Sequence, residues 1–125
     1  MDPIADFLTI IRNGYLAKKE TALVKKSKIR SALADILVKT GFLIAAKDTD
    51  KGLELTLHYM ANGDPVVTHI KRISKPGVRR YVGVDQIPSA LSGAGVTILS
   101  TPAGLLTDKE ARGKRLGGEV ICQIW

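Results

Sequence analysis

Apolar residues near the N-terminus recur with the spacing of an amphipathic helix. They stand at positions i, i+3, i+4 and i+7, namely Ile4, Phe7, Leu8 and Ile11. This spacing places them on one face of a helix, where they can pack against a core. Asp2 is a suitable N-cap, Pro3 suits the first helical position, and Gly14 predicts the end of the helix.

A second helix is predicted from the same kind of pattern. Ser27 is a suitable N-cap, and Gly41 predicts the end. The apolar residues between them again share one helical face, and they are Ile29, Leu33, Ile36 and Leu37. A short strand is predicted between the two helices, at Thr21–Val24.

Beyond Gly41 the pattern changes to the two-residue period of strands. Apolar and polar residues alternate over Leu53–Tyr59, which is typical of a strand with one buried face. We predict a second strand before it, at Phe42–Lys47. Asn62-Gly63 predicts a hairpin turn that leads into a third strand, Val66–Ile73.

The turn signal Ser74-Lys75-Pro76-Gly77 predicts a domain boundary after Ser74. Beyond it we predict strands at Val78–Val82, Val96–Leu99 and Glu119–Trp125. Short helices are predicted at Asp85–Leu91 and from the capping box Thr107–Glu110 to about Arg115. The expected fold class is α+β with two small α/β domains. Residues 1–74 have the order α-β-α-β-β, and residues 75–125 are mostly antiparallel β with short helices.

Composition adds an aliphatic core and a basic charge to this picture. Hydrophobic residues make up 45% of the 125 residues, but aromatic residues only 5%. Lys and Arg (19) outnumber Asp and Glu (12), which gives a net charge of +7. Such a charge suits a polyanionic partner, but it also suits a merely solubilising surface, so the sum alone does not decide.

The distribution of the charges favours a nucleic-acid partner. Basic residues form three clusters, at 18–30, 71–80 and 112–115. Their cations are Lys18, Lys19, Lys25, Lys26, Lys28, Arg30, Lys71, Arg72, Lys75, Arg79, Arg80, Arg112, Lys114 and Arg115. Acids gather instead between Asp48 and Asp64. Segregated basic faces are the footprint of nucleic-acid binding, although the third cluster also fits cations at a helix C-terminus.

No constellation of catalytic or metal-binding residues is visible in the sequence. One cysteine, Cys122, and two histidines, His58 and His69, do not form a zinc-ligand spacing. Gly93-Ala94-Gly95 lacks the third glycine of a dinucleotide-binding motif. We therefore predict no enzyme activity, no metal and no cofactor, and a buried, inert Cys122 thiol.

We expect a cytoplasmic protein with no membrane partner. No apolar stretch approaches the about 20 residues that a bilayer-spanning helix needs. The N-terminus lacks the charged and apolar regions of a signal peptide, and a single cysteine suits a reducing compartment.

The polar segment Ser100–Gly104 is the best candidate for recognition of a ligand. The hydroxyls of Ser100 and Thr101 can read base edges or the ribose 2′-hydroxyls of RNA, which lysines alone cannot do. Tyr81 can supply a stacking face for an unpaired base. Taken one residue at a time, an ordinary tight turn and a core tyrosine are the favoured interpretations.

Three blocks of sequence carry a family resemblance. The first is DPIADFLTIIRN at residues 2–13, and the second runs from Ile73 to Pro88. The third begins with Gly95-Val96-Thr97 and ends with GGEVIC at residues 117–122. In this order and spacing, over essentially the whole chain, they resemble bacterial ribosomal protein number eight of the small subunit.

The resemblance implies two small α/β domains and direct binding to a helix in the central domain of the small-subunit ribosomal RNA. It implies early assembly beside ribosomal proteins five and twelve of the subunit. It also implies that the protein can repress translation of the messenger RNA of its own operon, as bacterial members of the family do. By position, RNA-binding roles are implied for Ser100, Thr101, Gly104, Tyr81, Glu119, Lys75, Arg79 and Arg112 in the C-terminal domain. In the N-terminal domain they are implied for Asp2, Pro3, Thr9, Arg12, Asn13, Ser27 and Lys28.

The chain departs from the family pattern in the recognition loop. The family loop usually reads Ser-Thr-Ser-Lys-Gly, whereas Pro102 and Ala103 stand at its third and fourth positions here. A hydroxyl, a backbone donor and a cation are therefore missing, which predicts weaker discrimination between bases or an altered RNA partner at that point. The alternative function is a regulatory or protein-interaction module that binds messenger RNA or an acidic protein.

Overall fold

The computed structural model describes residues 2–125, which divide into two compact units between Val67 and Thr68. Both units combine helices with an antiparallel sheet, so the α+β fold class is confirmed. The expected boundary lay after Ser74. The structure differs because the strand at residues 70–72 pairs with a strand of the second unit.

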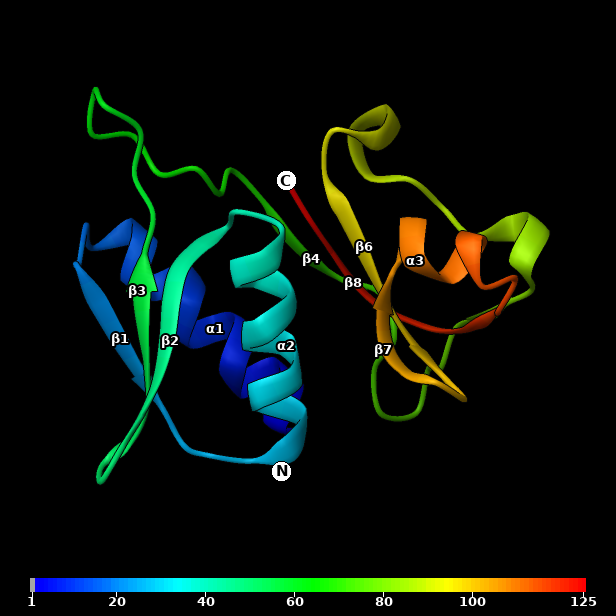
Figure 1. Cartoon of the computed structure of the whole chain (residues 1–125), viewed down its shortest axis with the longest axis horizontal. Coiled ribbons are helices and arrows are strands. Elements are labelled where there is room, and N and C mark those ends of the chain that lie inside the picture. Colours follow the sequence, from blue (N-terminus) through cyan, green and yellow to red (C-terminus); the bar gives the residue numbers. More distant parts are fainter. Residues whose placement is uncertain (1) are drawn as a thin grey trace. The chain divides into compact units, whose positions relative to one another are not determined.

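The first unit packs two helices against a small sheet. Its elements are α1 (Pro3–Leu16), β1 (Thr21–Val24), α2 (Lys28–Lys39), β2 (Leu43–Thr49) and β3 (Gly52–Leu57). The strand order is β1-β3-β2, and both pairings are antiparallel. Figure 1 shows α1 and α2 on the same face of this sheet.

The helices of the first unit begin where their caps predict. The Asp2 carboxylate accepts hydrogen bonds from the backbone N–H groups of Ile4 and Ala5, each at 3.1 Å. The Ser27 hydroxyl accepts one from the Arg30 N–H at 3.2 Å. Capping of this kind satisfies donors that have no partner within a helix.

Gly14 does not end α1, which continues to Leu16. A Cβ atom at Gly14 would lie 2.9 Å from the Cδ1 atom of Leu57 in β3. The glycine therefore permits close packing of the helix on the sheet. The core below it contains side chains that are fully buried, among them Phe7, Ile11, Leu33, Leu37 and Leu55.

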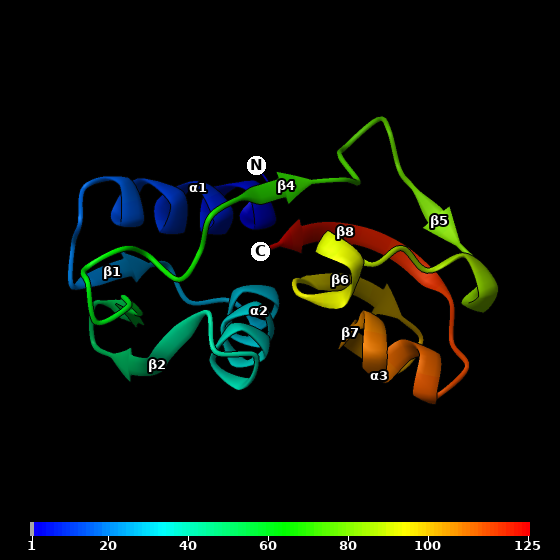
Figure 2. The same ribbon diagram turned by 90° about the horizontal axis from the view of Figure 1, so that it is seen from above.

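The second unit is built around a long central strand. Its strands are β4 (Ile70–Arg72), β5 (Tyr81–Val82), β6 (Val96–Thr101), β7 (Gly104–Thr107) and β8 (Gly118–Ile124). Its helices are the 3-10 turns η1 (Val84–Gln86) and η2 (Ala90–Gly93), and α3 (Asp108–Gly113). The sheet order is β4-β8-β6-β7, and β5 also pairs with β8. Figure 2 shows β4 and β5 along one side of β8 and β6 along the other.

The structure corrects four predictions for the second half of the chain. The strand expected at Val66–Ile73 covers only residues 70–72 and pairs with β8. The strand expected at Val78–Val82 shrinks to β5, and the helix expected at Asp85–Leu91 is two 3-10 turns. The segment expected to be a loop, Ser100–Gly104, is the tip of the β6–β7 hairpin.

One face of the second sheet carries the core of the unit. Leu99 and Val120 are paired on β6 and β8, and they pack with Leu106, Ile87 and Ala111 of α3. The predicted capping box is present, because the Thr107 hydroxyl accepts from the Glu110 N–H and the Glu110 carboxylate accepts from the Thr107 N–H, both at 3.1 Å. It fixes the start of α3 against this core.

Candidate nucleic-acid interface

Three of the predicted site residues lie in one row across the second sheet. Glu119 on β8 is paired with Tyr81 on β5 and with Ser100 on β6. Directly paired residues of antiparallel strands project from the same face of a sheet. Because the neighbouring residues Leu99 and Val120 face the core, this row lies on the opposite face.

Tyr81 presents its ring at the end of this row. Its side chain is exposed, at 70% of the maximum, whereas the next residue, Val82, packs against the core. The core location that the sequence left open for Tyr81 is therefore excluded. An exposed ring on a sheet offers a flat surface on which a base can stack.

The Thr101 hydroxyl is already engaged at the tip of the hairpin. It donates a hydrogen bond to the Gly104 carbonyl oxygen at 2.8 Å and accepts one from the Ala103 N–H at 3.1 Å. At Thr101 the structure therefore contains the ordinary tight turn that the sequence also allowed, in which the side chain bonds to the backbone of its own turn. A hydroxyl has one donor and two acceptor lone pairs, so one lone pair of Thr101 is left to accept a hydrogen bond from a ligand.

Glu119 is held by two residues from the segment that precedes β5. One oxygen of its carboxylate, Oε2, accepts hydrogen bonds from the Ser74 hydroxyl and from the Arg79 guanidinium, the latter at 3.1 Å. Burial alone would raise the pKa of Glu119. The bonds from Ser74 and Arg79, together with the charges of Arg79 and Arg72, outweigh burial and lower that pKa below its ordinary value. The carboxylate is therefore ionised at neutral pH.

The segment from Ser74 to Arg80, here called the basic strap, carries much of the second basic cluster. Mutual hydrogen bonds between the backbones of Lys75 and Val78, at 3.0 and 2.9 Å, close its turn. Beside it lies an open hollow of about 440 Å³. Its lining contains four cations and no acid, and consists of Lys71, Arg72, Ile73, Lys75, Val78 and Arg80. Such a surface attracts phosphate groups.

Arg112, a predicted phosphate contact, is tied to its own unit. Its guanidinium donates to the Ile87 carbonyl oxygen at 3.0 Å and to the Ser89 hydroxyl at 2.8 Å. It also pairs with the buried carboxylate of Asp108 at 3.4 Å. These contacts connect α3 to the segment between η1 and η2. Arg112 therefore has a structural role in the free protein.

The predicted residues of the first unit fall into two groups. Arg12 and Asn13 lie three and four positions after Thr9, and all three are on the exposed side of α1. Asp2 and Pro3 begin α1, while Ser27 and Lys28 begin α2. An ion pair of 3.3 Å between Asp6 and Arg30 brings these two helix starts together.

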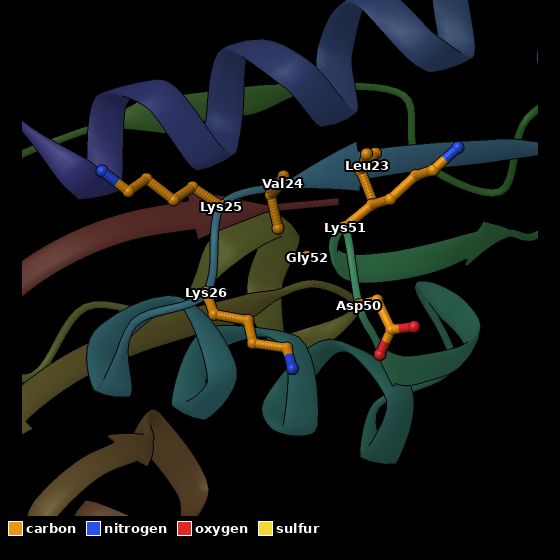
Figure 3. Close-up of a pocket in the computed structure, with 7 residues that line it drawn as sticks. All are labelled: Leu23, Val24, Lys25, Lys26, Asp50, Lys51 and Gly52. Atoms are coloured by element: carbon orange, nitrogen blue, oxygen red, sulfur yellow. The ribbon is translucent and has the colours of Figure 1, made fainter.

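The first basic cluster is smaller than the sequence indicates. Arg30 is buried and paired with Asp6, and the Lys18 ammonium donates to the Gly63 carbonyl oxygen at 2.9 Å. Lys25, Lys26 and Lys51 surround a shallow hollow at the end of β1, together with Leu23, Val24, Asp50 and Gly52. Figure 3 shows that the three lysine side chains point in different directions. They do not converge on a common ligand position.

The remaining candidate groups are the Cys122 thiol and the imidazoles of His58 and His69, and each is buried or in contact with other parts of the protein. Burial raises the pKa of the Cys122 thiol to about 12, although the charge of Arg72 opposes this. His58 Nδ1 lies 2.8 Å from the Gly41 carbonyl oxygen, and His69 stacks on Trp125 with ring centres 5.3 Å apart. Within residues 2–125, no group of three or more potential metal ligands is found. Nor does any helix of this range have the length and apolarity to cross a bilayer.

Sequence reasoning missed Ser74 as part of this surface and counted Arg72 only as a charge of the second basic cluster. Ser74 was interpreted only as a turn residue, yet its side chain is buried and bonded to Glu119. Arg72 donates to the Ser74 carbonyl oxygen and contributes to the lowered pKa of Glu119. These contacts join residues up to 45 positions apart in the chain, so no local sequence pattern predicts them.

The two sheets and this polar row define a small, basic α+β protein whose second unit presents hydroxyls, an exposed aromatic ring and cations together. Comparison with known proteins identifies its family. A family model for ribosomal protein S8 matches residues 2–125. The chain belongs to the ribosomal protein S8 family, and the resemblance noted in the sequence is confirmed.

Individual relatives match over nearly their whole length. The chain is 50% identical to the small ribosomal subunit protein uS8 of Caldanaerobacter subterraneus subsp. tengcongensis. It is 48% identical to the proteins of the same name from Lactobacillus delbrueckii subsp. bulgaricus and Enterococcus faecalis. Each alignment covers 99% of this chain and 97% of the relative.

Proposed function

We propose that this chain is a structural, non-enzymatic component of the small ribosomal subunit in the cytoplasm and binds the ribosomal RNA of that subunit directly. Membership of the ribosomal protein S8 family supports the place in the subunit. The observation that supports direct RNA binding is the row of Tyr81, Glu119 and Ser100 on one face of the sheet, beside the basic strap.

The two parts of this surface suit different parts of an RNA. Lys75 and Arg79 carry charges that attract phosphates, which supplies affinity but little selectivity. Ser100 and Thr101 offer hydroxyl groups to base edges or ribose, and Tyr81 offers a stacking face. Unstacked bases are exposed in an irregular helix rather than in a regular duplex. We therefore propose an irregular helix in the central domain of the RNA as the target.

The first unit extends the proposed contact. The exposed side of α1, with Thr9, Arg12 and Asn13, and the paired starts of α1 and α2 offer polar groups to a second RNA segment. Both helix starts carry partial positive charge, which favours phosphates. We further propose early binding during subunit assembly, with ribosomal proteins five and twelve as neighbours.

The same surface supports a second, regulatory function. It would recognise the shape of an RNA, so a messenger that folds like the ribosomal helix would compete for it. We propose the messenger of the chain's own operon as this competitor. An acidic protein is the alternative partner, and a chain that binds such a protein in place of RNA would show no preference for the ribosomal helix in the experiment below.

Binding of the full chain to a fragment of its own small-subunit RNA tests the proposal. Affinity for the central-domain helix should exceed that for an arbitrary duplex at moderate salt. Nucleotides of that helix should be protected in footprinting. The logarithm of affinity should fall with the logarithm of salt by roughly 0.7–0.9 per phosphate contact. Equal affinity for both RNAs would overturn direct, selective binding.

A further inference from the structure

Glu119 is an unexpected residue in the middle of a surface that binds phosphates. Its carboxylate is ionised and 14% exposed, and it stands between Tyr81 and Ser100. A negative charge repels an approaching RNA backbone, and partial burial adds a cost of desolvation. The carboxylate must therefore provide something that outweighs both effects.

The Glu119 carboxylate is hydrogen-bonded to two residues of the basic strap. Its Oε2 atom accepts from the Ser74 hydroxyl and from the Arg79 guanidinium. The Ser74 side chain is almost fully buried, and its oxygen also accepts the backbone N–H of Arg80 at 3.2 Å. Ser74 thus joins the two ends of the strap to each other and, through Glu119, to β8.

This arrangement holds the cations of the strap in place. Long basic side chains lose conformational entropy when they are ordered on a partner, and a prior fixation of their backbone reduces that loss. Arg79 is oriented by its bond to Glu119, while Lys75 and Arg80 face the hollow beside the strap. One buried hydroxyl and one carboxylate therefore organise three cations.

We propose that Ser74 and Glu119 form a positioning pair that fixes the basic strap on β8 for contact with RNA phosphates. Glu119 then acts on RNA through Ser74 and Arg79 and does not read a base. The inference rests on the proposed RNA-binding function and adds how its phosphate-contacting part is organised.

The competing role for Glu119 is direct readout. A carboxylate can accept a hydrogen bond from the amino group of a base such as cytosine. Removal of its charge would then change selectivity between RNA sequences. Removal of the Ser74 hydroxyl would leave that selectivity and the affinity unchanged.

The test compares Ser74→Ala, Glu119→Gln and the double variant in the full chain. Affinities are measured over a range of salt concentrations, on the central-domain helix and on the same helix with single base substitutions. Each single variant should lose about tenfold in affinity, as expected when a hydrogen bond to a charged group is lost. The salt slope should fall by about one. The double variant should lose no more than the larger single loss, because both residues belong to one unit.

A matched control separates positioning from general destabilisation. Leu106→Ala removes most of a buried side chain on β7 that packs in the core of the same unit and is remote from the strap in sequence. It should lower the unfolding midpoint without changing the salt slope. If Ser74→Ala does not fold, Glu119→Gln is compared with Arg79→Ala and their double variant by the same criteria. The conservative variant Arg79→Lys should restore most of the slope lost in Arg79→Ala.

Three outcomes would overturn the positioning role. In the first, Ser74→Ala keeps wild-type affinity and slope. In the second, the double variant loses as much binding free energy as the two single variants lose together. In the third, Glu119→Gln alone changes the ratio of affinities between the original and substituted helices. All three presuppose that the wild type prefers its helix. A wild type without that preference refutes the proposed function and, with it, this inference.

Discussion

The backbone carbonyl oxygen of Ser100 lies so close to Gly118 that a Cβ atom on Gly118 would stand only 2.1 Å from it. No side chain fits between β6 and β8 at this point. The close approach sets Ser100 beside Glu119, the residue that follows Gly118. The glycine is therefore needed for the geometry of the polar row as well as for the sheet.

Replacement of Gly118 by alanine should lower the free energy of unfolding by about 2–4 kcal/mol, because β6 must move away from β8. Urea denaturation measures the change. Gly113 in α3 is a matched control, since a Cβ atom there meets nothing within 4 Å. Gly113→Ala should be neutral or stabilising by about 0.4–1 kcal/mol. Equal stability of the two variants would contradict the close approach.

The lowered pKa of Glu119 predicts a specific dependence of stability on pH. The folded protein holds the carboxylate in its ionised form, so the unfolded chain binds a proton more readily in mildly acidic solution. The stabilisation by Glu119 is therefore complete above its ordinary pKa of 4.5 and is lost as the pH falls through the lowered pKa of the folded state.

Urea denaturation between pH 7 and pH 3 checks this sign. Only the wild type titrates at this position, because the amide of Glu119→Gln does not ionise. The difference in stability between them should shrink as the solution becomes acidic. Ser74→Ala should show a weaker acid loss than the wild type, since one of the bonds that lower the pKa is gone. A difference that stays constant with pH would contradict the assignment.

Local signals predicted the first unit well and the second less well. The helices that begin after Asp2 and Ser27 combine a cap with an apolar face, and both signals lie within one segment. The strand at Ile70–Arg72 depends instead on pairing with β8, more than 45 positions later. Its sequence is compatible with several partners, so its true neighbour was not predicted.

The same distinction explains the candidate site. Ser100 and Tyr81 were identified by their chemistry and by a family pattern, and the structure brings them to opposite sides of Glu119. Ser74 was overlooked because a buried serine in a turn looks like an ordinary turn residue until its partner is known. The structural partners of Arg112 were overlooked for the opposite reason, since its charge is visible in the sequence and its partners are not.

The contacts of Arg112 predict a loss of stability rather than a loss of phosphate binding on substitution. Arg112→Ala removes bonds to Ile87 and Ser89 and leaves the buried Asp108 carboxylate without its cation. The free energy of unfolding should fall by about 2 kcal/mol. The salt slope of RNA binding should not change. An unchanged stability with a slope lower by about one would restore Arg112 as a phosphate contact.

The Thr101 hydroxyl ties the hairpin tip and retains one lone pair for a ligand, so its removal has two effects. Thr101→Val should abolish the hydrogen bonds to the Gly104 carbonyl and from the Ala103 N–H, and it should reduce the preference for the cognate helix over its base-substituted forms. The salt slope should remain, because no charge is lost. Thr101→Ser keeps the hydroxyl and should keep the preference. Equal selectivity of both variants would show that the hydroxyl does not contribute to recognition.

Pro102 and Ala103 form the exposed turn between β6 and β7, where the family pattern noted in the sequence leads us to expect serine and lysine. Substitution with Pro102→Ser and Ala103→Lys together adds a hydroxyl and a cation beside Thr101. Affinity for the central-domain helix should rise, and the salt slope should increase by about one for the added lysine. The preference over base-substituted helices should also rise if the serine hydroxyl contacts a base.

The single variants separate these contributions, because Ala103→Lys adds only charge and Pro102→Ser adds only the hydroxyl and the backbone N–H. Proline also stiffens the turn before binding, so Pro102→Ser alone can lose part of what the hydroxyl contributes. Binding titrations at matched salt concentrations measure the effect of each single substitution on affinity. No difference between the double variant and the wild type on the cognate helix would mean that the tip of the hairpin lies outside the RNA contact, and Ser100 and Tyr81 would then carry recognition without it.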